Sequence, residues 1–391
     1  CKAKCTFCNF ASDAFAGDRM QSYVERVCAE IGVARRRAVE LDAALPGGAD
    51  SVYFGGGTPS LLSGEQFRQI FRCLRGEFEL AAGAEITLEC APGQLSDGTL
   101  EELLRQGMNR ISFGVQSFVD AESVAVGRLH TRQMCEEELA RVRAAGVGEI
   151  NIDLIAGLPY QTEESWRFSV ERAIASGVPH VSVYMLEVDE ESRLGREMLE
   201  KGSRYHASAV PPEDAAAEWY QWACEAFAAA GLQQYEISNF AREGHRSRHN
   251  LKYWRREPYA GFGLDAHSML RTDGGAVRFA NGDDLDGYFD GGETGSAALK
   301  RFGPAALEVE VVGSEQAFEE SLFLGLRLNE GVELDALRGR FGEAMMGAVM
   351  PALLEVREAG LLEMENGWAR LTGRGRMASN EVFSRLLVAS A

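Results

Sequence analysis

Three cysteines at the start of the chain follow the pattern C-x3-C-x2-C, at Cys1, Cys5 and Cys8, with Phe7 directly before the third. Three thiolates on so short a loop indicate an iron–sulfur cluster. A [4Fe–4S] cube normally takes four cysteine ligands, so one iron would stay open to another ligand. A zinc site is the alternative, but it needs a fourth sulfur or imidazole ligand. The stretch from Asn9 to Arg26 contains no Cys or His, so the cluster is favoured.

A glycine-rich turn follows the first predicted strand after this loop, in the order Gly55, Gly56, Gly57, Thr58 and Pro59. Residues without a Cβ atom let backbone N–H and C=O groups approach a ligand closely. Alone, the run fits a tight strand–helix turn as well as it fits a binding site. Its position one strand after the cysteine loop favours binding.

Four polar residues stand at or just beyond consecutive predicted strand ends: Glu89, Gln116, Arg128 and Asp153. In parallel α/β folds the active site lies at the C-terminal ends of the strands. Carboxylates accept hydrogen bonds from ribose hydroxyls and from an ammonium group, and arginine pairs with a carboxylate. Each residue alone is as easily a surface or helix-cap residue, but together they predict a site for a nucleoside and an amino acid.

The elements that position these residues alternate between strand and helix, which predicts a parallel sheet. The predicted strands are 51–54, 85–89, 110–115, 149–155 and 180–186, and the predicted helices are 22–45, 64–75, 97–106, 134–145, 163–176 and 213–230. The chain does not begin with Met, so we expect the native N-terminus and a first strand upstream of Cys1. The pattern then gives six units and predicts a partial, TIM-like (β/α)6 barrel over residues 1–232. An open doubly wound sheet is the alternative.

Two smaller regions follow the predicted barrel. Residues 233–313 lose the regular alternation and are rich in Gly, Asn and Asp, which predicts a β-rich extension with loops. Residues 314–391 show helical patterns at 318–327, 334–341 and 345–359, followed by a short hairpin pattern, which predicts a winged-helix-like α module. Because that segment is rich in Glu, a structural or protein-contact role is favoured over DNA binding.

The stretch from Tyr235 to Trp254 carries a different set of groups. It holds His245 and His249 four residues apart, three arginines, and the neighbouring aromatics Tyr253 and Trp254. Such a set could receive a planar anionic ligand, with imidazole as an axial iron ligand and arginines opposite carboxylates. The alternative, that this stretch forms a hydrogen-bonded cap over the barrel, is nearly as well supported. The remaining thiols and His267 are interpreted as structural; the thiols are Cys28, Cys73, Cys90, Cys135 and Cys224.

Composition excludes several classes of partner and compartment. The net charge is −19, from 59 acidic and 40 basic residues, and this field repels nucleic acid. No apolar stretch is long enough to predict a transmembrane segment. Eight cysteines, of which only the first three are closely clustered, do not form a secreted disulfide framework. We therefore expect a cytoplasmic or organelle-matrix protein in a reducing compartment.

Taken in order, the motifs resemble the radical S-adenosylmethionine (SAM) superfamily, in its HemN-like (coproporphyrinogen dehydrogenase-like) branch, and most closely the HemW haem chaperones. The resemblance covers nearly the whole chain. It rests on CKAKCTFCNF, YFGGGTPSLL, ITLECAPG, RISFGVQSF, GRLH, NIDLIAGLPYQT, YEISNFAREGHRSRHNLKYW, GLDAHS, LFLGLRLNEGV and SNEVFS. No single motif suffices, but their order and spacing are highly specific.

The resemblance implies a cofactor set and its residues. It implies a [4Fe–4S] cluster on Cys1, Cys5 and Cys8, whose open iron chelates SAM. It places SAM around Phe7, Gly56, Gly57, Thr58, Glu89, Gln116, Arg128 and Asp153. It also implies haem binding by the motif His-Asn-x-x-Tyr-Trp, matched here by His249 to Trp254. The chain departs from the family pattern in two places: Ala91 stands where Asn is usual, and Leu264-Asp265 stand where Pro-Gly is usual.

Three functions remain open at this point. The first is a haem chaperone that delivers haem to acceptor proteins, including membrane-bound ones. The second is an oxygen-independent coproporphyrinogen III oxidase, or a related radical SAM enzyme acting on porphyrins. The oxidase carries a fourth cysteine two positions after the third, where this chain has Phe10, as HemW does. That difference favours the chaperone. The third is a degenerate barrel that serves only as a protein-binding platform.

Overall fold

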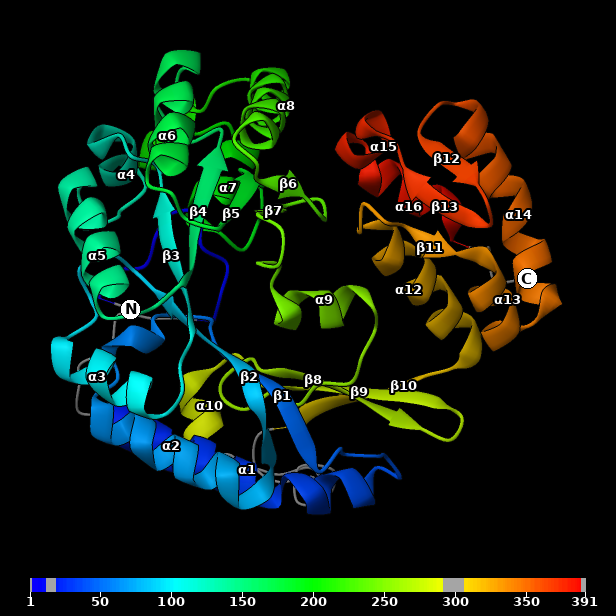
Figure 1. Ribbon diagram of the computed structural model, residues 1–391, viewed down its shortest axis with the longest axis horizontal. Coiled ribbons are helices and arrows are strands. Elements are labelled where there is room, and N and C mark those ends of the chain that lie inside the picture. The colour runs from blue at the N-terminus through cyan, green and yellow to red at the C-terminus, as the bar shows by residue number, and fades with distance from the viewer. Residues whose placement is uncertain (1, 12–18, 291–305, 388–391) are drawn as a thin grey trace. The chain divides into compact units, whose positions relative to one another are not determined.

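The computed structural model describes residues 2–11, 19–290 and 306–387 (Figure 1). These residues divide into two compact units. The first unit comprises residues 1–28, 48–234 and 238–246, and the second comprises residues 29–47, 235–237 and 247–391. The boundaries predicted from the sequence, 1–232, 233–313 and 314–391, stay predictions. Within the described ranges, every helix is too short or too polar to cross a lipid bilayer.

A seven-stranded sheet organises the first unit, in the order β1-β2-β3-β4-β5-β7-β6. The first five strands pair in parallel, as predicted, and short β7 joins β5 in antiparallel fashion. The strands are β1 (Gly48–Phe54), β2 (Glu79–Cys90), β3 (Arg110–Gln116), β4 (Glu149–Ala156), β5 (His180–Met185), β6 (Gln233–Gln234) and β7 (Asn239–Ala241).

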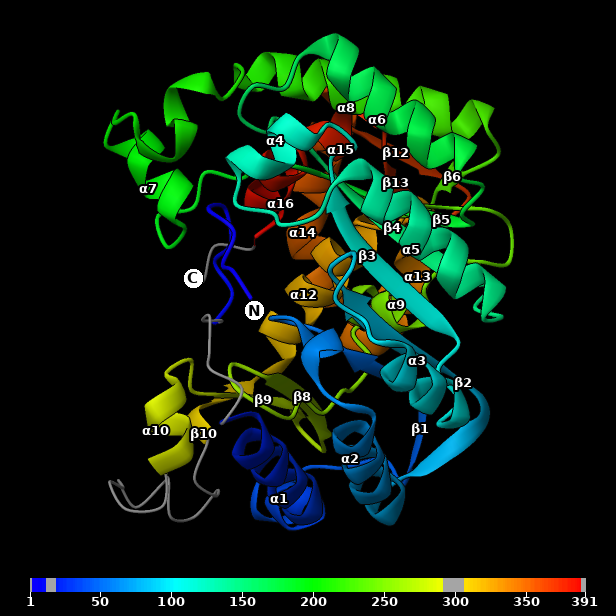
Figure 2. The same cartoon turned by 90° about the vertical axis from the view of Figure 1, so that its left-hand side faces the viewer.

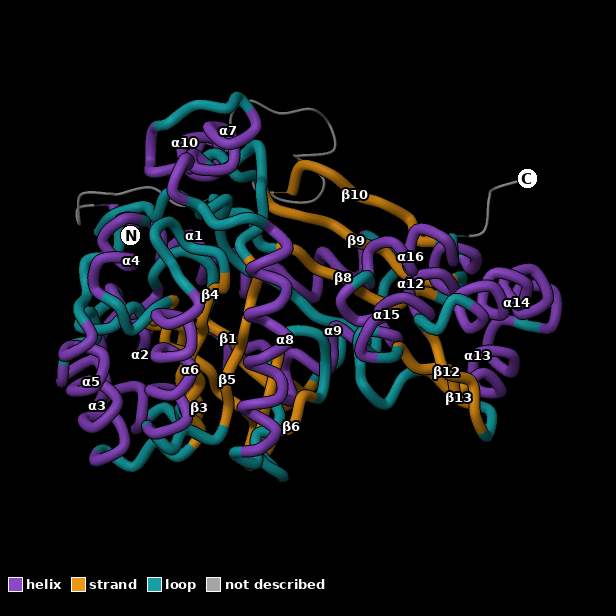
Figure 3. The backbone as a smooth tube through the Cα atoms, turned by 90° about the horizontal axis from the view of Figure 1, so that it is seen from above, coloured by secondary structure: helices purple, strands orange, loops and turns teal. Residues whose placement is uncertain are grey.

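Helices of this unit line one side of the strands (Figures 2 and 3). They are α2 (Gly64–Glu77), α3 (Asp97–Arg105), α4 (Asp120–Ala125), α5 (Arg132–Ala144), α6 (Glu163–Ala175) and α8 (Glu213–Ala229). Local sequence sets where they begin. Ser63 and Gln66 form a capping box at the start of α2, and the side chain of Thr131 accepts a hydrogen bond from Met134 N at the start of α5. This one-sided arrangement is the open, partial barrel of the predicted fold class rather than a doubly wound sheet.

The two faces of the parallel sheet differ in polarity. Alternate residues such as Ile111, Phe113 and Val115 are fully buried apolar side chains. The residues between them, Ser112 and Gly114, belong to the opposite face because side chains alternate along a strand. Polar residues occupy the matching positions of the neighbouring strands: Tyr53, Thr87, Glu89, Asn151, Asp153 and Ser182. One face therefore packs on helices, and the other carries the polar groups.

The second unit contains two small antiparallel sheets. One has the order β10-β9-β8, from β8 (His267–Thr272), β9 (Gly275–Asn281) and β10 (Ala306–Val312), and the other has the order β11-β13-β12. Long helix α1 (Met20–Glu40) crosses from the first unit into the second. Short helix α9 (Arg248–Trp254) precedes the first of these sheets, and α10 (Leu285–Asp290) follows β9. Asp265 has a φ of 57°, at the position where the resemblance expects glycine.

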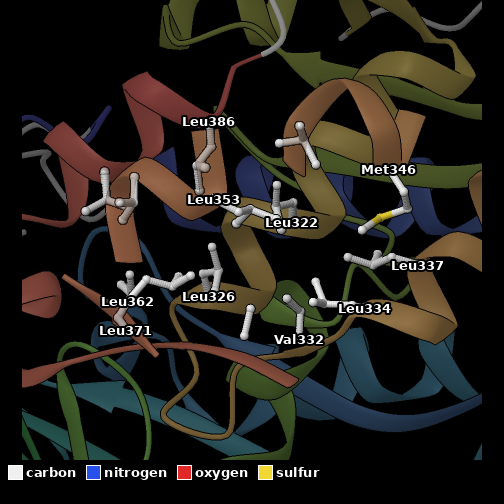
Figure 4. Close-up of a cluster of buried hydrophobic side chains, with 14 of the residues drawn as sticks. Leu322, Leu326, Val332, Leu334, Leu337, Met346, Leu353, Leu362, Leu371 and Leu386 are labelled. Atoms are coloured by element: carbon white, nitrogen blue, oxygen red, sulfur yellow. The ribbon is translucent and has the colours of Figure 1, made fainter. Parts of the chain in front are cut away.

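The C-terminal region matches the predicted helices and hairpin. It contains α12 (Ser314–Leu326), α13 (Leu334–Phe341), α14 (Glu343–Glu358), the strands β11 (Val332–Glu333), β12 (Leu362–Glu365) and β13 (Trp368–Leu371), and the short helices α15 (Gly373–Met377) and α16 (Ser379–Leu386). Figure 4 shows their shared apolar core, in which Leu326, Leu353 and Leu371 meet. Among the described residues, the buried side chains of this core come from these elements alone.

Candidate functional site

The cysteine loop is held by backbone contacts on both sides of Thr6. The N–H of Thr6 donates to Val126 O at 3.0 Å, and Thr6 O accepts from Leu194 N at 2.8 Å. Cys5 is buried and Cys8 is partly exposed, while predicted ligand Cys1 lies outside the described residues. Phe7 packs against a small apolar cluster that includes Val126. These contacts hold the backbone of the loop that carries Cys5 and Cys8.

Burial and nearby charges act on the Cys5 thiol in opposite directions. Burial raises the pKa of the Cys5 thiol, and the guanidinium groups of Arg128 and Arg193 oppose that rise. A three-thiolate iron–sulfur cluster carries net negative charge, so nearby cations would favour its binding.

The glycine turn lies beside Glu89, as the strand order predicts. Gly56 N donates to Glu89 Oε2 at 3.1 Å, and Tyr53 Oη donates to Glu89 Oε1 at 2.7 Å. A Cβ atom on Gly55 would come within 2.6 Å of the Tyr53 ring and 3.0 Å of Glu89 Oε1. Gly56 has a φ of 93°, which favours glycine. Gly57 is exposed and Thr58 partly exposed, so the turn offers backbone groups to a ligand.

Burial raises the pKa of Glu89 to about 7, although the residue keeps some solvent exposure. The hydrogen bond from Tyr53 opposes this rise, and the charge of Asp153 adds to it. Glu89 is therefore poised to change charge near neutral pH.

Gln116 and Arg128 meet around Gly114. Arg128 Nη2 donates to Gly114 O at 2.8 Å. A Cβ atom on Gly114 would lie 2.4 Å from Arg128 Nη2 and 2.9 Å from Gln116 Nε2, so it would displace the ends of these two side chains. Gln116 has a φ of 66°, an unfavourable value for a non-glycine residue. Among the described residues, Gln116 Oε1 and Arg128 Nε are buried without a hydrogen-bond partner.

Asp153 lies in a polar network that the sequence did not predict. Asn151 Nδ2 donates to Asp153 Oδ1 at 2.7 Å, and Ser112 Oγ donates to Asp153 Oδ2 at 3.2 Å. Asn151 Oδ1 lies 2.6 Å from His180 Nδ1. Burial raises the pKa of Asp153, and these hydrogen bonds oppose the rise. Polar residues at every second position of β3, β4 and β5 were the available sequence signal.

Glu89, Gly114, Gln116, Arg128 and Asp153 together form what we call the strand-end cradle. It offers two carboxylates, one amide and one guanidinium, and two of its buried polar atoms have no partner among the described residues. Orphaned buried polar atoms are rare in folded proteins and indicate groups that bind something else. The residues present therefore fit a ligand with amine, carboxylate and hydroxyl groups, as SAM has.

Helix α9 carries the predicted haem-binding motif in the second unit. Its N-cap, Ser247, accepts from Asn250 N at 3.2 Å. His249 is partly exposed, and its Nε2 lies 3.1 Å from Tyr253 Oη, one helical turn later. The ring of Tyr253 also packs edge-on against Tyr259, with a centroid distance of 4.8 Å. We call His249, Tyr253 and Tyr259 the α9 face.

Other candidates from the sequence have structural surroundings. His245 Nδ1 lies 2.8 Å from Glu149 Oε1, within the first unit. His267 Nδ1 lies 2.9 Å from Asp265 O. Cys90 and Cys135 are buried, and burial raises the pKa of each thiol to about 12, so both are unreactive. The surroundings of His267, Cys90 and Cys135 are those of structural residues, whereas His245, a candidate for the planar ligand, contacts a carboxylate of β4.

Models of two domain families match the chain. The Radical SAM superfamily matches residues 1–173, and the HemN C-terminal domain matches residues 313–378. Heme chaperone HemW of Bacillus subtilis is 34% identical over 341 residues, which is 86% of this chain and 85% of that protein. Heme chaperone HemW of Lactococcus lactis is 30% identical over 388 residues, which is 99% of this chain and 95% of that protein.

A solved structure shares the fold. Coproporphyrinogen III oxidase (HemN) from Escherichia coli, described as a radical SAM enzyme, superposes with a TM-score of 0.81. The two sequences are 21% identical, and the match covers 99% of this chain and 88% of that one. At this identity the likeness establishes the architecture and leaves the chemistry to the site residues.

Proposed function

The chain belongs to the HemW family of the radical SAM superfamily, and from that membership we propose that it is a haem chaperone. In this proposal it carries a [4Fe–4S] cluster and SAM, binds haem through His249, and delivers haem to acceptor proteins, including membrane-bound ones. The partly exposed imidazole of His249 on the α9 face is the observation that carries the proposal.

The cofactor part of the proposal rests on the first unit. Cys1, Cys5 and Cys8 would hold the cluster, and the strand-end cradle would hold SAM together with Phe7, Gly56, Gly57 and Thr58. When bound and reduced, such a cluster supplies one electron to SAM. Within the cradle, Arg128 and Gln116 have buried polar atoms available for a carboxylate or an amine. Glu89 and Asp153 would accept from ammonium and ribose hydroxyls once both are ionised.

The haem part of the proposal rests on helix α9. An imidazole is a common axial ligand of haem iron, and a ligating histidine usually has a second group that orients its ring. Tyr253 and Tyr259 are aromatic neighbours against which a flat macrocycle can pack. Tyr253 is 37% exposed, so this packing surface is open on at least one side.

A haem titration followed by absorbance tests the proposal. We expect the wild-type protein to develop a Soret band that saturates, and His249→Ala to weaken haem binding by at least about tenfold, because an axial ligand is lost. His267→Ala is the matched control, since His267 is an exposed histidine of the same unit with its Nδ1 beside a backbone carbonyl. Equal haem affinities for the wild type and His249→Ala would show that His249 is not the haem ligand.

The competing enzymatic function is tested separately. Anaerobic incubation of the reduced, cluster-loaded protein with SAM and coproporphyrinogen III should leave the porphyrinogen unchanged if the chaperone proposal holds. Formation of protoporphyrinogen IX would replace the proposal with oxidative decarboxylation, the activity of the oxidase whose fold the chain shares.

A further inference from the structure

The segment after β5 forms three hydrogen bonds with the cysteine loop. Leu194 N donates to Thr6 O at 2.8 Å, and the neighbouring Arg193 side chain donates to Lys4 O. Asn9 Nδ2 donates to Asp189 Oδ2 at 2.5 Å. All three contacts lie within the first unit, and they link residues on both sides of Cys5 and Cys8 to the start of helix α7 (Arg193–Leu199).

Arg193 is itself held in place by a strained neighbour. Its guanidinium lies 5.4 Å from the ring centroid of Tyr205, in the short helix η3 (Arg204–Ala209). Tyr205 and His206 have φ values of 54° and 62°, two successive non-glycine residues in the left-handed region. The hydrogen bond between His206 Nδ1 and Tyr160 Oη, at 2.8 Å, helps to hold this conformation. Strain of this kind persists only where surrounding contacts enforce it, and it concentrates at functional sites.

The charge of Arg193 also bears on the reduction potential of a cluster held by the cysteine loop. The Arg193 guanidinium donates to Lys4 O, the carbonyl of the residue directly before Cys5, so its charge lies beside the cysteine loop. A cluster on three thiolates becomes more negative by one unit when it takes up an electron. A fixed cation close to the loop therefore favours the reduced form, and charge and hydrogen bonding around such clusters are known to set their potentials.

We propose that Arg193 is a positioning residue for the cluster: it fixes the cysteine loop through Lys4 O and raises the reduction potential of the bound cluster. This inference rests on the proposed function to the extent that it assumes the cluster. The sequence motifs do not draw attention to Arg193, because it lies far along the chain from the cysteines, at the start of the helix that follows the fifth parallel strand.

A redox titration of the anaerobically loaded protein tests the effect of Arg193 on the reduction potential. The reduced cluster is monitored by electron paramagnetic resonance. For Arg193→Gln we expect up to a tenfold fall in the ratio of reduced to oxidised cluster at a fixed potential, equivalent to about 59 mV for one electron. Arg193→Lys should restore most of the ratio, because the charge is kept. Arg196→Gln is the control, since that arginine lies on the same helix and donates to Glu190 O instead.

Hydrogen exchange on the cluster-free protein tests the positioning part. We expect Arg193→Gln to exchange faster than the wild type at Thr6 and Leu194, and Arg196→Gln to match the wild type. If the wild type fails to bind a cluster, the cofactor proposal fails, and the exchange result still decides whether Arg193 fixes the loop. Wild-type exchange at both amides in Arg193→Gln, or a wild-type potential in a loaded Arg193→Gln protein, would overturn the inference.

Discussion

The strand-end cradle and the α9 face are built in opposite ways. The cradle draws its groups from three parallel strands and a loop, and ties Asp153 into a network with Asn151, Ser112 and His180. The α9 face comes from one helical turn and a nearby tyrosine, with a partly exposed histidine. The first is partly buried and is tied together by hydrogen bonds across strands, as a preorganised site is. The second is also partly exposed, but its groups come from a single helix and one tyrosine beside it, so its arrangement is local.

The largest effect should come from filling the space at Gly114. We expect Gly114→Ala to weaken SAM binding by about 10- to 100-fold, because its Cβ would displace the Arg128 guanidinium from its place beside Gln116. Isothermal titration of the cluster-loaded protein measures this. Gly76→Ala is the control: no atom lies within 4 Å of its added Cβ, and alanine favours the helix. A wild-type affinity in Gly114→Ala would show that the cradle is not preorganised.

The next effect should be on folding stability. We expect Asn151→Ala to lower the free energy of unfolding by roughly 1–3 kcal/mol, because it leaves buried polar partners in β3, β4 and β5 unsatisfied. Denaturant unfolding followed by circular dichroism measures this. Gln133→Ala, at an exposed amide on α5, should change stability by less than about 0.5 kcal/mol. Similar values for both variants would mean that the network does not stabilise the sheet.

A change of pH should act on the cradle through Glu89. With a pKa of about 7, the ionised fraction of Glu89 rises about tenfold from pH 6 to pH 8, and we expect SAM affinity to rise with it. The effect on stability has the opposite sign. Because the folded-state pKa lies above the unfolded value, the contribution of Glu89 to stability is full below pH 4.5 and is lost as the pH rises through about 7.

Titrations at several pH values test this, with Glu89→Gln as the comparison. The variant should bind SAM more weakly at pH 8 and should lose most of the pH dependence. An unchanged pH dependence in Glu89→Gln would show that another group, not Glu89, causes the pH dependence of SAM affinity.

The smallest effect should come from the α9 face. We expect Tyr253→Phe to change stability by less than about 0.5 kcal/mol, because its hydroxyl is exposed. It should nonetheless shift the Soret band of bound haem, since the hydroxyl lies 3.1 Å from His249 Nε2. A stability loss as large as that of Asn151→Ala would show that the α9 face contributes as much to folding stability as the network around Asp153.

The sequence predicted the parallel strands and the strand-end residues well because both depend on local patterns. Each predicted strand needed only a short apolar run, and Glu89 and Gln116 lie at the C-terminal ends of β2 and β3. Asp153 lies inside β4, three residues before its end at Ala156. The antiparallel strands β6 and β7 were missed because each is only two or three residues long. Such strands are defined by their partners in the sheet, and no periodicity of their own indicates them.

The missed site residues act through contacts that the predicted elements did not indicate. Tyr53, Asn151 and Arg193 act through contacts with residues 36, 2 and 189 positions away in the chain. Tyr53 lies within the predicted strand 51–54, and Arg193 lies outside every predicted element. Only the folded chain brings the guanidinium of Arg193 to the carbonyl of Lys4, so spacing alone could not reveal it.

The two-sided character of the parallel sheet has a consequence for how the chain folds. A strand that is apolar on both faces can slide along its neighbour by one residue at little cost, but here a one-residue slip would turn Ile111 and Phe113 toward the polar face. It would also bury Ser112 among helices without its partner Asp153. The residues that suit ligand chemistry therefore also enforce the register of the strands. Apolar replacements of these polar residues would therefore make a one-residue shift in strand register easier.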